Sequence, residues 1–219
     1  MTSALRRLFL VATPLALAVV LWWHPPGGAD VYAGVRHDVD AWLTVHTTFL
    51  LFIPLLGLAA FILLSGLESR AATVSRVALV FFLVFYTAYE VTVGVGTGIL
   101  VDYANGLRAP EQAAVADAIE DYNGNALLAD PVSVSLVLGF FGWVVAMLAA
   151  AVAVRRAGAG WPATLLLGGA AVFAVHPPPL GPIGLACFAA AAILIERWQA
   201  RDASAAAAPA ATGGLAPSS

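Results

Sequence analysis

One carboxylate, Glu90, interrupts an apolar stretch that runs from 77 to 101. At 100° per residue, Tyr86, Tyr89 and Thr97 fall on the same helical arc as Glu90, and a polar arc of this kind is expected to face other helices rather than lipid. No Arg lies within the apolar stretches of the chain. A carboxyl group buried without a cation tends to keep its proton. The sequence therefore predicts an intramembrane polar site at these four residues.

Two roles are open to Glu90. An ionisable residue inside a membrane indicates function by default, and proton or cation coupling in a small transporter would use such a group. Alternatively, Glu90 donates one interhelical hydrogen bond, worth about 1 kcal/mol. Pro14 and Pro54 leave the carbonyls of Leu10 and Leu50 free to accept it. The structural role is favoured, because no second acid or basic relay accompanies Glu90.

Histidines offer the second candidate chemistry. Imidazoles with carboxylates suit a first-row transition metal, and two imidazoles at matched depth can hold a haem. His24 and His176 each end a helix just before prolines, where an imidazole can bond the free terminal carbonyls, so this role is favoured for them. Only His46 lies well within a predicted helix, and neither a metal nor another cofactor is assigned. The candidate metal ligands are His37, Asp38, Asp40 and His46.

Composition indicates the elements that must position these residues. The chain is 61% hydrophobic and 11% charged, with a mean hydropathy of +0.90, whereas about a quarter of an ordinary soluble domain is charged. A bilayer core needs about 20 helical residues. The sequence predicts an all-α polytopic membrane protein, a six-helix transmembrane bundle within residues 1–198. The predicted spans are about 8–23, 41–64, 77–101, 132–154, 161–175 and 180–196.

The remaining segments are connections and a tail. Loop 102–130 is predicted to contain a short helix at 110–121, because Pro and acidic residues open it and an Asn-Gly pair closes it. The tail 199–219 contains Ala, Pro, Gly and Ser with almost no bulky residue, a composition that predicts disorder.

The basic residues predict the orientation. The positive-inside rule places Arg-rich loops in the cytoplasm. With both termini cytoplasmic, only Arg36 and Arg108 lie outside, and the outer loops are acidic. We therefore expect a multi-pass protein of the cell (plasma or inner) membrane. The Arg residues on the cytoplasmic side are Arg6, Arg7, Arg70, Arg76, Arg155, Arg156, Arg197 and Arg201.

Other signatures are few. The chain has no serine nucleophile in a glycine elbow, no His-Glu-x-x-His and no P-loop, so no catalytic residue is assigned. An acidic exterior argues against nucleic acid as a partner. The favoured hypothesis is a structural or accessory membrane protein that presents an acidic extracytoplasmic cap to a protein partner or a second copy. The alternatives are a proton- or cation-linked transporter centred on Glu90 and a metal- or haem-binding redox protein that uses the outer histidines.

Several motifs together carry a resemblance. They are the His-Pro turn after the first span, Trp42 and His46, the run Gly94, Gly96 and Gly98, and the Pro-rich turn 176–182. In these motifs residues 1 to about 198 resemble a group of multi-pass membrane proteins of GC-rich bacteria. The resemblance implies a membrane bundle and brings no activity or ligand with it.

Overall fold

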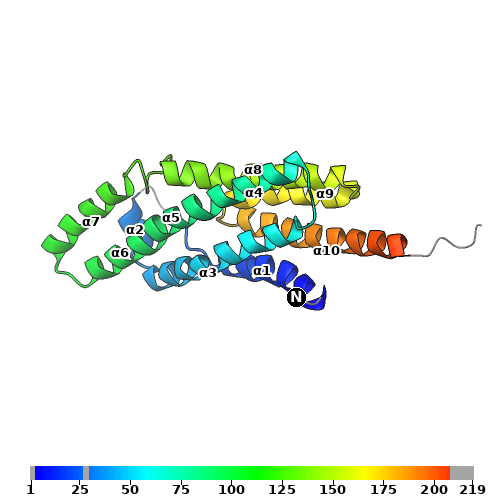
Figure 1. The fold of residues 1–219 in the computed structure, drawn as a ribbon. Coiled ribbons are helices and arrows are strands. Elements are labelled where there is room, and N and C mark those ends of the chain that lie inside the picture. Colours follow the sequence, from blue (N-terminus) through cyan, green and yellow to red (C-terminus); the bar gives the residue numbers. More distant parts are fainter. Residues whose placement is uncertain (1–2, 27–29, 208–219) are drawn as a thin grey trace, which may run out of the picture.

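The protein is a bundle of helices, seen along its side in Figure 1. The computed structural model describes residues 3–26 and 30–207, and every regular element in these ranges is helical. Five helices are long and apolar enough to cross a membrane. The all-α fold is therefore confirmed, and the helices fit a multi-pass membrane protein.

The long helices differ in regularity. One of them is a continuous rod from Arg70 to Asn105 that contains two π-helical segments. The other long helices are α1 (Ser3–Trp22), α3 (Val39–Leu63), α8 (Val134–Arg156) and α10 (Leu180–Ala207). The rod is made of α4 (Arg70–Phe81), η1 (Phe82–Tyr86), α5 (Thr87–Tyr89), η2 (Glu90–Gly96) and α6 (Thr97–Asn105). The shorter elements are α2 (Val31–Val35), α7 (Ala109–Asn123), α9 (Trp161–Gly169) and the 3-10 turn η3 (Ala170–Ala174).

The pair α9 and η3 corresponds to the sequence's fifth predicted span, and it is short. Its nine α-helical and five 3-10 residues reach roughly 23 Å, less than the ~30 Å hydrocarbon core. The chain then turns at His176 and returns as α10. Within this turn His176 is half-buried, whereas residues 177–180 are exposed.

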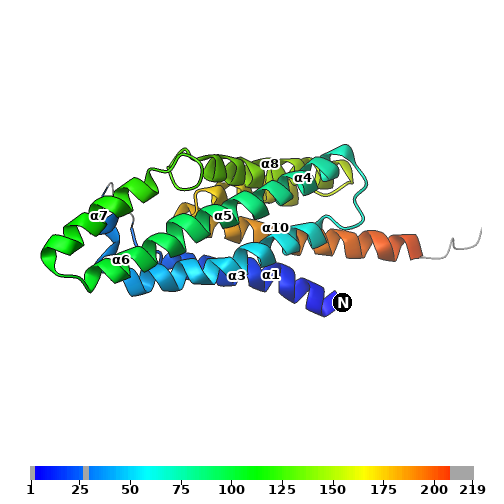
Figure 2. The same ribbon diagram turned by 60° about the vertical axis from the view of Figure 1, so that its left-hand side comes forward.

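Close packing joins the rod to α8, and the two helices run side by side in Figures 1 and 2. A Cβ added at Gly142 would lie 2.6 Å from the backbone nitrogen of Phe82, and one at Gly139 would lie 2.6 Å from that of Tyr86. Small residues allow membrane helices to approach in this way. The α8 glycines therefore fix the position of the rod at its first π-helical segment, η1.

A cap closes one end of the bundle, which we call the α7 end. Here α7 lies over α6 and α2 (Figure 2). Ile119 of α7 is buried in a small apolar cluster with Tyr32, Val35 and Trp42. The Glu120 side chain accepts a hydrogen bond of 3.0 Å from the backbone N–H of Tyr32.

At the opposite end, an ion pair joins the first and last helices. Arg6 of α1 lies 2.8 Å from Glu196 of α10 and also donates to Ser65 in the turn after α3. Helix α1 packs along α10 and α3. The N-terminal helix is therefore an integral part of the bundle.

The C-terminal region differs from the sequence prediction. Residues 199–207, predicted to be disordered, continue α10 as helix to Ala207. Alanine has the highest helix propensity of all residues, so the run of alanines extends a helix that tertiary packing has already nucleated. The rest of the predicted tail, 208–219, lies outside the described residues.

The close contact of α8 with the rod gives a first prediction. Gly142→Ala should lower the free energy of unfolding by about 1–3 kcal/mol, because the new methyl group meets the Phe82 backbone. Gly168→Ala is the matched control, since its Cβ would find no atom closer than 3.9 Å. Thermal unfolding of both variants in detergent provides the measurement. Equal melting temperatures for the two variants would contradict the packing described here.

Candidate metal centre

Glu90 lies in the middle of the rod and is 1% exposed. It begins the π-helical segment η2, and η1 ends four residues before it, at Tyr86. Insertions of π-helix into α-helices are rare and are frequent at functional sites. The backbone around this carboxyl group is therefore irregular where the sequence alone predicted a regular helix.

Two imidazoles face the Glu90 carboxyl group. Oε2 lies 3.8 Å from Nε2 of His46, and Oε1 lies 3.8 Å from Nδ1 of His176. These distances are too long for hydrogen bonds, and Oε1 has no hydrogen-bond partner among the described residues. The predicted acceptors, the carbonyls of Leu10 and Leu50, are thus not hydrogen-bonded to Oε1.

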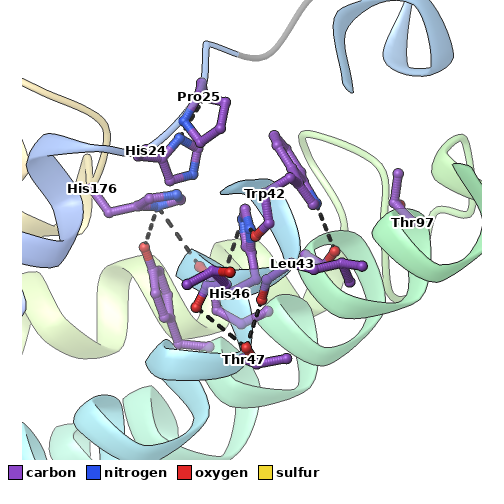
Figure 3. Close-up of polar contacts among 12 residues, drawn as sticks. His24, Pro25, Trp42, Leu43, His46, Thr47, Thr97 and His176 are labelled. Carbon is purple, nitrogen blue, oxygen red and sulfur yellow. Dashed lines mark hydrogen bonds and ion pairs between the residues drawn. The ribbon is translucent and has the colours of Figure 1, made fainter. Parts of the chain in front are cut away.

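A third imidazole completes the group. His24 follows α1, His46 lies in α3, and His176 lies in the turn before α10. Each offers one ligand atom, and these atoms all lie within 4.8 Å of one another. Figure 3 shows the three rings turned toward a common space. One helix and two segments next to helix ends thus bring three candidate nitrogen ligands together.

Hydrogen bonds at Nδ1 fix the orientation of each ring. Nδ1 of His24 donates to the carbonyl of Pro25 at 2.6 Å, and Nδ1 of His46 donates to the carbonyl of Trp42 at 2.8 Å. Nδ1 of His176 lies 2.7 Å from the Tyr86 hydroxyl. Metal-binding histidines typically use one nitrogen for such an oxygen and the other for the metal. Nε2 therefore remains as the ligand atom, and Nε2 of His24 is buried without a partner among the described residues.

Burial favours the neutral form of His24 and His176, the two members of the group that lie outside the spanning helices. Burial lowers the pKa of His24 below the usual 6.5. Burial, together with the neighbouring His24 and His46, lowers the pKa of His176 well below that value. Only a neutral imidazole has a lone pair to give to a metal ion. Both side chains are thus in the form that binds.

Trp42 and Gly94 hold His46 in place from two sides. The indole of Trp42 stacks on the His46 ring with 4.2 Å between ring centroids, and its Nε1 donates to the carbonyl of Gly94 at 2.7 Å. A Cβ at Gly94 would lie 2.1 Å from Cδ2 of His46. The missing side chain at Gly94 therefore leaves the space that the imidazole occupies.

The polar arc predicted around Glu90 is divided in the structure. Tyr86 is fully buried and contacts His176. Tyr89 borders a cavity beneath α7. Thr97 donates to Asn123 of α7 and lies apart from the histidines in Figure 3. Glu90 and Tyr86 therefore share one site, whereas Tyr89 and Thr97 face the cap.

Of the candidate metal ligands His37, Asp38, Asp40 and His46, only His46 belongs to the group of three histidines. His37, Asp38 and Asp40 are exposed near the start of α3. The two further members, His24 and His176, were assigned to helix ends by sequence reasoning. The signal that could have found them is the His-Pro-Pro string, which occurs at His24 and again at His176.

Comparison with known proteins finds no relative. No family model matches the chain, and neither the curated proteins nor the solved structures contain a significant match.

Proposed function

We propose that this multi-pass membrane protein binds a first-row transition metal ion through the imidazoles of His24, His46 and His176, with Glu90 as the accompanying anion. The observation that carries the proposal is the convergence of three imidazole ligand atoms within 4.8 Å. They lie next to a buried carboxyl oxygen that has no hydrogen-bond partner in the described part of the chain. Imidazole ligands suit zinc, copper, iron and nickel.

The distances fit a metal ion after a small adjustment. Zinc binds imidazole nitrogen at about 2.0–2.1 Å, and ligands in tetrahedral arrangement are then about 3.4 Å apart. The widest pair of nitrogens, at 4.8 Å, must therefore close by about 1.4 Å, which side-chain rotation can supply. Glu90 offsets part of the charge of a divalent ion, and a charge in a region of low dielectric requires such a counter-ion.

The orientation inferred from the sequence places this centre toward the extracytoplasmic side. Eight of the ten basic residues belong to the loops and helix ends opposite α7, which supports the α7 end as the outer one. Both termini are then cytoplasmic, in the plasma or inner membrane. The metal would be bound from outside the cell.

Transport across the bundle has less support. Fully buried aromatic rings lie on the cytoplasmic side of Tyr86: Trp143 has ring centroids at 4.8 Å from Phe82, 5.3 Å from Phe173 and 6.2 Å from Phe188. Such a layer offers no ligand to a hydrated cation. This aromatic layer is therefore a barrier to movement of a metal ion from the three histidines toward the cytoplasm.

An accessory role with a protein partner is the second candidate. The exposed side of α7 carries Glu111, Asp117 and Asp121, so the cap presents carboxylates to solvent as the sequence analysis expected. A metal centre that ties α1, α3 and the turn before α10 together would stabilise this cap and is compatible with that role.

The metal content of the purified full-length chain tests the proposal. Wild-type protein should bind one Zn²⁺ or Co²⁺ per chain, and His24→Ala, His46→Ala and His176→Ala should each weaken the affinity by at least about 100-fold. His37→Ala is the control, because this histidine is exposed and lies outside the group. Calorimetry and elemental analysis give affinity and stoichiometry. Retention of wild-type affinity by all three variants would refute the assignment.

Glu90 has its own prediction. Glu90→Gln keeps the shape of the side chain but removes the charge, so the affinity for Zn²⁺ should fall about tenfold or more while the protein remains folded. Glu68→Gln, at an exposed position, provides the same charge change far from the centre. A Gln variant that binds as tightly as wild type would remove Glu90 from the site.

Gly94 tests the positioning of His46. Gly94→Ala should displace the imidazole and weaken metal affinity about tenfold, because the new methyl group overlaps Cδ2. Gly106→Ala is the control, since its Cβ would meet nothing closer than 3.5 Å. Titration with Co²⁺, followed by its visible absorption, reports the number and geometry of ligands in both variants. An unchanged Co²⁺ spectrum and affinity in Gly94→Ala would contradict a positioning role.

A further inference from the structure

A cavity lies beneath the cap, on the side of the bundle that faces α7. Its volume is about 430 Å³, and its walls include Trp42, Tyr89 and Val93 from the bundle and Glu120, Asn123 and Asp130 from α7 and the following loop. This volume falls within the range of ligand-binding cavities. It is therefore large enough for a hydrated metal ion.

Only one layer of side chains separates the cavity from the metal centre. Trp42 lines the cavity and also stacks on His46 at 4.2 Å and meets His24 edge-on at 5.5 Å. Tyr89 and Val93, also in the wall, directly precede Glu90 and Gly94 in the rod. The Trp42 indole is thus the partition between the cavity and the imidazoles.

The charges in the cavity wall have one sign. Glu120 and Asp130 are its only ionisable carboxyl groups among the described residues, and no basic side chain lines it. One oxygen of each carboxylate is held by a backbone N–H, that of Tyr32 at 3.0 Å for Glu120 and that of Val132 at 2.8 Å for Asp130. The other oxygen of each carboxylate accepts no hydrogen bond from the described residues. A concave surface with one sign of charge concentrates counter-ions and raises their association rate.

We propose that this cavity is the vestibule through which a divalent metal ion reaches the three histidines, with Trp42 as the side chain that moves aside. The inference rests on the proposed metal centre and adds its route and its gate. Beyond the partition lie two atoms of the proposed metal centre, Oε1 of Glu90 and Nε2 of His24, which are buried without hydrogen-bond partners among the described residues. The single hydrogen bond from Trp42 to the Gly94 carbonyl is the one side-chain bond that opening of this gate breaks.

Association kinetics of Co²⁺ with the full-length chain in detergent, measured by stopped-flow absorbance, test the vestibule. The double variant Glu120→Gln/Asp130→Asn should bind about three- to tenfold more slowly than wild type at low ionic strength, with an unchanged dissociation rate and final stoichiometry. The control is Asp117→Asn/Asp121→Asn, which removes the same charge from exposed positions of α7. High salt should bring the vestibule variant and the control to the same rate.

The gate is tested by Trp42→Phe, which keeps an aromatic ring but loses the Nε1–H. Association of Co²⁺ should accelerate by about threefold or more, because the Phe ring is no longer bonded to the Gly94 carbonyl. Dissociation should accelerate by at least as much, since Trp42 also stacks on His46. Equal rates for the vestibule variant and its control would overturn the route, and unchanged rates in Trp42→Phe would overturn the gate. If the proposal of a metal centre is itself wrong, the result is different, because wild-type protein will then bind no Co²⁺ at any time.

Discussion

A carboxyl group in a low-dielectric environment needs partners, and Glu90 imposes this requirement on the bundle. Its position, 1% exposed within a helix that is otherwise suited to lipid, would be costly if the surrounding side chains were apolar. The chain supplies three imidazoles and a tyrosine hydroxyl at the same depth, each from a different part of the sequence. The packing of α1, α3 and the turn before α10 is thus coupled to one polar centre.

The shape of that centre depends on the backbone as much as on the ligands. Glu90 begins the π-helical segment η2, and η1 ends four residues before it. Helix α8 approaches η1 through glycines that leave no room for a Cβ. On the other side, Gly94 leaves space for the His46 ring. A rigid second layer of this kind holds ligand side chains in one geometry. The close glycine contacts and the π-helical turns therefore hold these side chains in position without a larger number of polar residues.

Local patterns in the sequence were sufficient to predict the fold but not the group formed by the three histidines and Glu90. The apolar runs, the Arg distribution and the Pro-rich turn at 176–182 are short-range signals, and they predict an all-α membrane bundle. The site depends on contacts between residues far apart, such as His24 and His176, which become neighbours only through the packing of α1 on α10. The 100° arc of Glu90 included Thr97 because it assumed a regular α-helix, and the wider turns of η2 lie between these two residues. Tyr89, directly before Glu90, lines the cavity beneath the cap instead.

The ion pair of Arg6 with Glu196 bears on how the protein is made. It links the first transmembrane helix to the last, and His24 and His176 lie at the far ends of this same pair of helices. During synthesis α1 enters the membrane long before α10 exists, so its polar partners are missing until the ribosome has finished α10. The three imidazoles can therefore assemble only after α10 has been inserted. A fragment truncated before α10 retains all three histidines but lacks the helix on which α1 packs. Assembly of the three histidines in this way depends on complete insertion of the helices.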